Sequence, residues 1–175
     1  NPYDDPLGQE EKLTKLFKDA IEQSYSEDAI EFSKYDLVVV FHAGIGQDFS
    51  LPFLDPTPED IPSTYIDENM IQEHLGESNI IVGNHAIQKG IILPETQNHL
   101  LYDISKTMFS DAENPCEYQY GITGTFSLMI GFAIGLPPLW NIQTGESGVG
   151  VFGLMDQGSN NGRGIIPAPP TAWSR

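Results

Sequence analysis

The sequence predicts an α/β fold in which helices pack on a mixed, twisted sheet, and three observations predict it. Residues 13–23 place apolar side chains at three- and four-residue spacing, which is typical of an amphipathic helix. Three short runs rich in β-branched residues, 37–41, 79–83 and 90–93, predict strands. The stretch 124–140 carries no charged residue and predicts a buried helix. The chain has 175 residues, 39% of them apolar, which is enough for a single domain with its own core.

The first half of the chain begins with the amphipathic helix. Its apolar stripe consists of Leu13, Leu16, Phe17, Ala20 and Ile21, with lysine and glutamate between them. The run 37–41 has no charge, so we expect a central strand buried on both faces. It leads into His42 and the two glycines 44 and 46, which permit a tight turn. A lone Gly-x-Gly is weak support for a phosphate site, and we expect His42 and Gly44 to be structural.

The next segment, residues 50–78, is rich in proline and acid and predicts a long surface excursion with one short helical turn near 68–74. Its acidic side chains are Asp55, Glu59, Asp60, Asp67 and Glu68. They supply the oxygen ligands that calcium prefers, although their spacing is not that of an EF-hand loop. A calcium site is therefore one prediction for this segment, and a solvated acidic face is the alternative.

The second half of the chain alternates short elements with breaks. Residues 84–89 separate the strands 79–83 and 90–93, and Pro94 is expected to close the second strand. Residues 99–109 have weakly helical spacing and end at a Pro-containing break. Further on, residues 147–152 predict an extended segment.

Charge and composition exclude some classes of function. The chain has 25 acidic and 8 basic side chains, and its net charge of -17 would repel nucleic acid and anionic membranes. The densely apolar run 126–136 is about half of the roughly 20 residues that a membrane span needs. Cys116 is the only cysteine, so no internal disulfide is expected. Because the chain begins at Asn1 without a leader, we expect it to be a trimmed piece of a longer protein.

Four segments in order carry a resemblance to a known family. They are residues 35–47, the run Phe-Ala-Ile-Gly-Leu-Pro at 132–137, the run Val-Phe-Gly-Leu-Met-Asp-Gln-Gly-Ser at 151–159, and the proline-rich stretch 167–173 that ends in Trp173. Together they resemble the immune inhibitor A-like secreted metallopeptidases, a metzincin family, over most of residues 10–175. The resemblance implies a metzincin-like fold with long loops over the former cleft and the 126 helix packed on the sheet.

A metzincin binds zinc through His-Glu-x-x-His on a helix, followed by a glycine and a third ligand three residues later. Gly135 corresponds to that glycine and fixes the register. The two histidine positions then fall on Leu128 and Phe132, the general base on Met129 and the third ligand on Pro138. None of these side chains can bind zinc or accept a proton. By the same resemblance Met155 would lie under the metal, and without ligands its role reduces to packing beneath the helix.

The resemblance with its vacant ligand positions implies a catalytically inactive metallopeptidase-like domain, a pseudoenzyme without zinc or another cofactor. We expect it to be a structural or protein-interaction module in a secreted or cell-surface assembly. Its partners would be other protein subunits or the remainder of its own polypeptide. One alternative is a peptide-binding domain that uses the old cleft, and another is a metalloprotease with relocated or externally supplied ligands. For relocated ligands, His85 and His99 are the pair that could approach each other. No serine has the surroundings of a catalytic triad.

Overall fold

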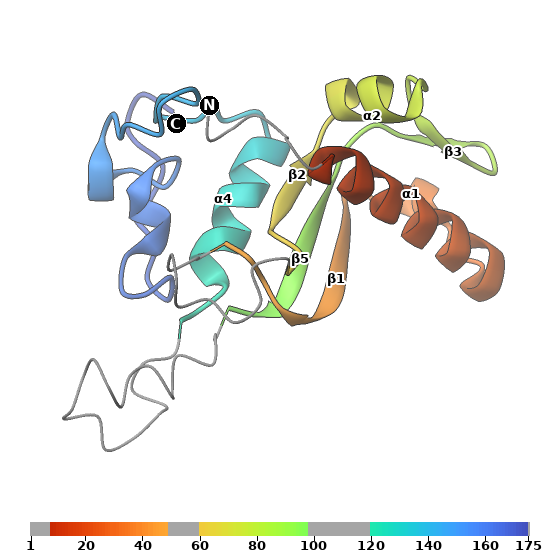
Figure 1. Ribbon diagram of the computed structural model, residues 1–175, viewed down its shortest axis with the longest axis horizontal. Helices are drawn as coiled ribbons and strands as arrows, with labels where there is room; N and C mark the ends of the chain where they lie inside the picture. Colours follow the sequence, from red (N-terminus) through yellow and green to blue (C-terminus); the bar gives the residue numbers. More distant parts are fainter. Residues whose placement is uncertain (1–7, 49–59, 98–119, 175) are drawn as a thin grey trace, which may run out of the picture. The chain divides into compact units, whose positions relative to one another are not determined.

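The computed structural model describes residues 8–48, 60–97 and 120–174 (Figure 1). The chain forms two compact units, one made of residues 1–42 and 64–93, the other of residues 43–63 and 94–175. We call them the first and the second unit. The single domain expected for residues 1–175 stays a prediction.

The first unit opens with helix α1, Gln9–Asp28, which confirms the amphipathic helix and extends it at both ends. Leu13, Phe17 and Ile21 are buried along one stripe, as their spacing predicts. Glu10 and Glu11 lie in the first turn, where negative charge favours the helix dipole. A short 3-10 helix, η1 (Phe32–Lys34), then leads to the sheet.

The main sheet has three strands in the order β1-β5-β2, namely β1 (Val38–Ile45), β5 (Gly90–Thr96) and β2 (Thr64–Ile66). Strand β2 is antiparallel to β5, with Tyr65 opposite Ile91. Strand β1 runs in the same direction as β5 (Figure 1). The expected α/β fold with a mixed sheet is therefore confirmed.

The place of β1 in this sheet corrects a prediction. The run 37–41 was expected to be a central strand buried on both faces, but β1 lies at an edge of the described sheet and Phe41 is 61% exposed. The central strand is β5, in which Ile91, Ile92 and Leu93 are fully buried. An apolar β-branched run favours a strand, but the order of pairing decides which strand is covered.

The predicted ends of both strands were also wrong. Strand β1 continues through His42 and Gly44 to Ile45, with Gly44 at φ 92°. The turn follows at Gly46, where a Cβ would overlap the ring of Pro94. Strand β5 continues through the buried Pro94 to Thr96. A proline removes one N–H donor and keeps its carbonyl, so it does not by itself end a strand.

Helix α2, Glu68–Leu75, confirms the short helical turn after the acidic segment. The Asp67 carboxylate caps it by accepting a hydrogen bond from the Met70 N–H at 2.9 Å. A two-stranded hairpin follows, β3 (Ile80–Val82) paired antiparallel with β4 (His85–Ile87). The first of these strands was predicted, and β4 was not.

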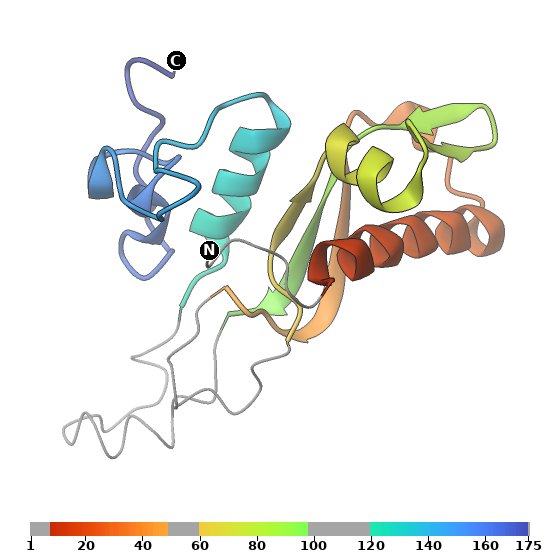
Figure 2. The same cartoon turned by 45° about the horizontal axis from the view of Figure 1, so that its top comes forward.

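The core of the first unit lies between its helices and strands. Helix α1 packs against α2, β2 and β3, and the two helices lie side by side in both views (Figure 1, Figure 2). The Phe17 ring fills the space where Gly90 would otherwise carry a Cβ. Glycine at the start of β5 therefore lets α1 approach the sheet closely.

The second unit contains helix α4, Thr123–Ala133, and two 3-10 helices, η3 (Gly150–Phe152) and η4 (Gln157–Asn160). The prediction of an extended segment at 147–152 was wrong, because only Ser147 forms an isolated bridge, to Trp140, residues 148–149 bend and the last three residues form η3. Helix α4 was expected to be buried, but only Gly124, Thr125, Gly131 and Ala133 are buried on it. Its small residues form the close contacts, and its large apolar side chains stay partly exposed. Within the described ranges, none of the helices has the length and apolarity to cross a membrane.

Candidate functional site

The C-terminus of α4 ends in a sharp turn at the glycine that fixed the register. Gly135 has φ 90°, in the left-handed region that favours glycine. The Gly135 N–H donates to the Phe132 carbonyl at 2.9 Å, and the Leu136 N–H donates to the Gly131 carbonyl at 2.9 Å. These two bonds form a Schellman motif, so the chain leaves the helix abruptly and runs on to Pro138.

The four positions assigned to a zinc site lie on and just after this helix. Leu128, Met129 and Phe132 belong to α4, Pro138 follows it, and all four are half-buried. Leu128 and Phe132 are four residues apart and so lie on one face of the helix. The Phe132 ring meets Trp140 edge to face, with centroids 5.9 Å apart and planes at 80°. This face is an apolar packing surface.

Met155 lies beneath α4. It is fully buried, and its sulfur occupies the space where Gly131 would carry a Cβ. Its carbonyl accepts a hydrogen bond from the Leu139 N–H at 2.8 Å, which ties it to the segment that leaves the helix. Gly131 thus permits a close approach of α4 to Met155 that a larger residue would prevent.

The next residue, Asp156, holds the neighbouring loop. Its Oδ2 accepts hydrogen bonds from Ser147 Oγ and from three successive backbone N–H groups, those of residues 148–150, at 2.7 to 2.9 Å. Its Oδ1 accepts from the Gln157 N–H at 2.8 Å. Burial raises the pKa of Asp156, but the hydrogen bonds from these donors outweigh it and leave the pKa below its ordinary value.

Asp156 was missed by sequence reasoning. The sequence analysis places it only in the turn around Met155 and predicts the neighbouring residues 147–152 to be an extended segment. A run of small residues next to an aspartate favours a loop whose N–H groups surround a carboxylate. That pattern was the available indication of its role.

The chemistry of the donor set does not fit a zinc ion. Zinc in proteins is held by thiolate, imidazole or carboxylate groups. Leu128, Phe132 and Pro138 carry none of these, and Met129 offers only a thioether. Among residues 8–48, 60–97 and 120–174, no three His, Cys, Asp or Glu side chains come together in a way that could hold a metal ion.

The acidic residues predicted for calcium divide into two sets. Asp55 and Glu59 lie outside the described residues. Asp67 caps α2, and Glu68 lies in the first turn of that helix. Asp60 precedes β2 and is half-buried. The structure therefore gives the Asp67 carboxylate a helix-capping role.

The histidines do not gather on α4. His42 lies half-buried within β1, and His85 lies in β4. His74 on α2 is 3.5 Å from the Glu10 carboxylate on α1, through Nε2. His99, the proposed partner of His85, lies outside the described residues, as does Cys116.

Comparisons of the sequence with protein-family models and with characterised proteins, and of the fold with solved structures, gave no match. The functional conclusions below therefore depend on the residues and geometry of this chain.

Proposed function

We propose that the chain is a catalytically inactive metallopeptidase-like domain of metzincin type that serves as a structural or protein-interaction module. One observation carries the proposal. The side chains of Leu128, Met129 and Phe132 on α4, and of Pro138 after it, stand where the metzincin resemblance assigns the zinc ligands and the base. The turn at Gly135 follows this helix, and Met155 packs beneath it. In this proposal, a helix and turn that resemble those of a zinc site carry side chains that bind no zinc. Replacement of buried polar ligands by apolar groups also removes a desolvation cost.

The surface of the second unit supports the interaction role. All of the net charge lies in residues 1–119, which hold 23 acidic and 6 basic side chains, whereas residues 120–175 hold two of each. In this neutral region Phe152 is 82% exposed and Trp173 is 77% exposed. Other large apolar side chains are also exposed there, namely Ile134, Ile142, Val151, Ile165 and Ile166. A protein partner that covers these side chains would remove their apolar surface from water.

The register is tested by rebuilding the zinc site. A variant with Leu128→His, Phe132→His and Pro138→His places three imidazoles at the vacant positions. We expect it to bind about one cobalt ion per chain with the absorption of a tetrahedral site, whereas the native protein binds none. The matched control carries Ile130→His on α4 and Ile134→His at its C-cap, which keeps the spacing of four residues away from the assigned positions and lacks the third ligand.

Three results would contradict the proposal. Equal cobalt affinity of the rebuilt and the control variant would show that the register is wrong. About one zinc per chain in the purified native protein would show that a zinc site exists. Proteolysis abolished by a chelator would show that the domain is an active metallopeptidase.

The alternative of a peptide-binding cleft has one observation in its favour, the partial exposure of Leu128 and Phe132. Substitutions at two positions distinguish binding in the old cleft from binding at the exposed apolar side chains of residues 120–175. Leu128→Asp would weaken binding if the old cleft is used. Phe152→Asp would weaken binding if the exposed apolar side chains of the neutral region are used.

A further inference from the structure

Arg163 has a backbone conformation that its side chain disfavours. It lies at φ 57°, between Gly162 at φ 56° and Gly164 at φ 73°. Glycine adopts this left-handed region at no steric cost, whereas a residue with a Cβ is strained there. The backbone hydrogen bonds at this place, from the Gly121 N–H to the Arg163 carbonyl and from the Gly124 N–H to the Gly164 carbonyl, both 2.8 Å, need no arginine side chain. An arginine between two glycines therefore indicates a role for the guanidinium.

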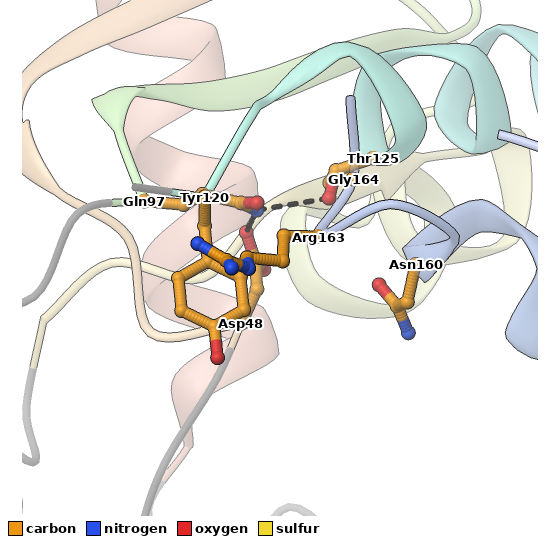
Figure 3. Close-up of a pocket in the computed structure, with 7 residues that line it drawn as sticks. All are labelled: Asp48, Gln97, Tyr120, Thr125, Asn160, Arg163 and Gly164. Atoms are coloured by element: carbon orange, nitrogen blue, oxygen red, sulfur yellow. Dashed lines mark hydrogen bonds between the residues drawn. The ribbon is translucent and has the colours of Figure 1, made fainter. Parts of the chain in front are cut away.

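The guanidinium lines a cavity of about 120 Å³ within the second unit. The other side chains around this cavity are Asp48, Gln97, Tyr120, Thr125 and Asn160. All of them are polar and come from four separate parts of the chain. Figure 3 shows the Arg163 side chain extending from its loop toward the side of the cavity that Tyr120 lines. Arg163 is the only basic residue among them.

One wall of the cavity is a fixed hydrogen-bond network. The Gln97 amide Nε2 donates to the Asp48 carboxylate at 2.6 Å and to the Thr125 hydroxyl at 2.9 Å (Figure 3). Gln97 and Thr125 are each only 9% exposed. Asp48 also accepts from the Ser63 N–H at 2.6 Å and from the Ser63 hydroxyl. Three donors thus surround the Asp48 carboxylate, and their hydrogen bonds offset the negative charge that it presents to the cavity.

The side chains of Arg163, Tyr120 and Asn160 also line the cavity, and each carries donor groups. A guanidinium offers N–H groups in a planar fork, a phenol offers an O–H, and a side-chain amide offers an NH₂. A planar fork matches the two oxygens of a carboxylate. The cavity has room for such a group with a few attached atoms.

We propose that this cavity binds a carboxylate group through Arg163, with Tyr120 and Asn160 beside it. The carboxylate belongs either to a small free acid or to the C-terminus of a peptide. The inference does not depend on the proposed function, since the cavity is lined by none of the vacant zinc positions.

The test is a titration of the ¹⁵N-labelled protein with N-acetylglycine, followed by NMR, at physiological salt. Amide shifts are expected around residues 97, 125 and 163–164. N-acetylglycinamide, which has the same shape without the charge, is expected to give none. A short peptide with a free C-terminus, and the same peptide with an amidated C-terminus, distinguish the two sources. If the natural ligand is a peptide C-terminus, the free peptide binds more tightly than N-acetylglycine does, and the amidated peptide does not bind.

Arg163→Gly separates the ligand role from a structural one. Glycine fits the left-handed backbone better, so the melting temperature is expected to stay the same or to rise. The affinity for N-acetylglycine is expected to fall about 10-fold or more, because a charge-assisted hydrogen-bond pair is lost. Lys34→Ala, an exposed site in the first unit, is the control for the loss of one positive charge.

Several results would overturn the proposal. One is equal binding of the acid and the amide. Another is an absence of shifts around the cavity. The third is unchanged affinity in the Arg163→Gly variant.

Discussion

At the scale of single residues, Asp156 has the most direct structural consequence. We predict that Asp156→Asn destabilises the protein by about 2 to 3 kcal/mol, since an amide cannot serve all five donors that the two carboxylate oxygens now satisfy. Urea unfolding measures the change. Glu146→Gln, an exposed neighbour, is the control and is expected to change stability by less than about 0.5 kcal/mol.

The same carboxylate gives a dependence on pH. Because the pKa of Asp156 is lower in the folded than in the unfolded chain, its charge contributes fully above the unfolded value of about 4. The contribution is lost as the pH falls through the folded value. The difference in unfolding free energy between wild type and Asp156→Asn should therefore be constant near neutral pH and shrink below about pH 4. A difference that stays constant down to pH 2 would contradict this account.

At the scale of elements, α4 depends on small residues where it meets η4. A Cβ on Gly124 would overlap the backbone carbonyl of Ser159, which cannot move aside as a flexible side chain can. We predict that Gly124→Ala lowers the free energy of unfolding by about 2 to 3 kcal/mol, although alanine stabilises an isolated helix by about 1 kcal/mol relative to glycine. Thermal unfolding measures it. Thr123→Ala, exposed on the same turn, is the control and should be nearly neutral.

The elements also show what the sequence could predict. Helix α1 was predicted because its apolar spacing is a local feature, and Leu13, Phe17 and Ile21 of that stripe are buried. Strand β4 was missed because a three-residue strand, His85–Ile87, exists through its pairing with β3. The edge position of β1 and the continuation of β5 through Pro94 are likewise set by neighbours distant in sequence.

In the candidate site, too, local features could be predicted and contacts between distant residues could not. The turn at Gly135 and the apolar residues on α4 could be predicted from a motif with fixed spacing. The network of Asp48, Gln97 and Thr125 could not, because it joins residues 49 and 28 positions apart. Arg163 gave a partial indication, as one of two basic residues in an otherwise nearly uncharged C-terminal third.

At the scale of the whole molecule, the dominant property is the uneven distribution of charge along the chain. Residues 1–119 carry the entire net charge of -17, and residues 120–175 are neutral. Like charges in a compact state repel one another, and salt weakens the repulsion because the screening length falls from about 30 Å at 0.01 M to about 3 Å at 1 M.

We predict that NaCl stabilises the protein by about 1 kcal/mol over that range, measured as the midpoint of urea unfolding.

Calcium at submillimolar concentration and constant ionic strength separates the two hypotheses for the acidic segment. A solvated acidic face leaves the midpoint unchanged. A calcium site that includes Asp60 or Glu68 raises it in proportion to ln(1 + [Ca²⁺]/Kd). We expect the first result, because Asp67 is already used as the cap of α2. For the NaCl prediction, an unfolding midpoint that does not change with NaCl would contradict the idea that charge repulsion destabilises the folded protein.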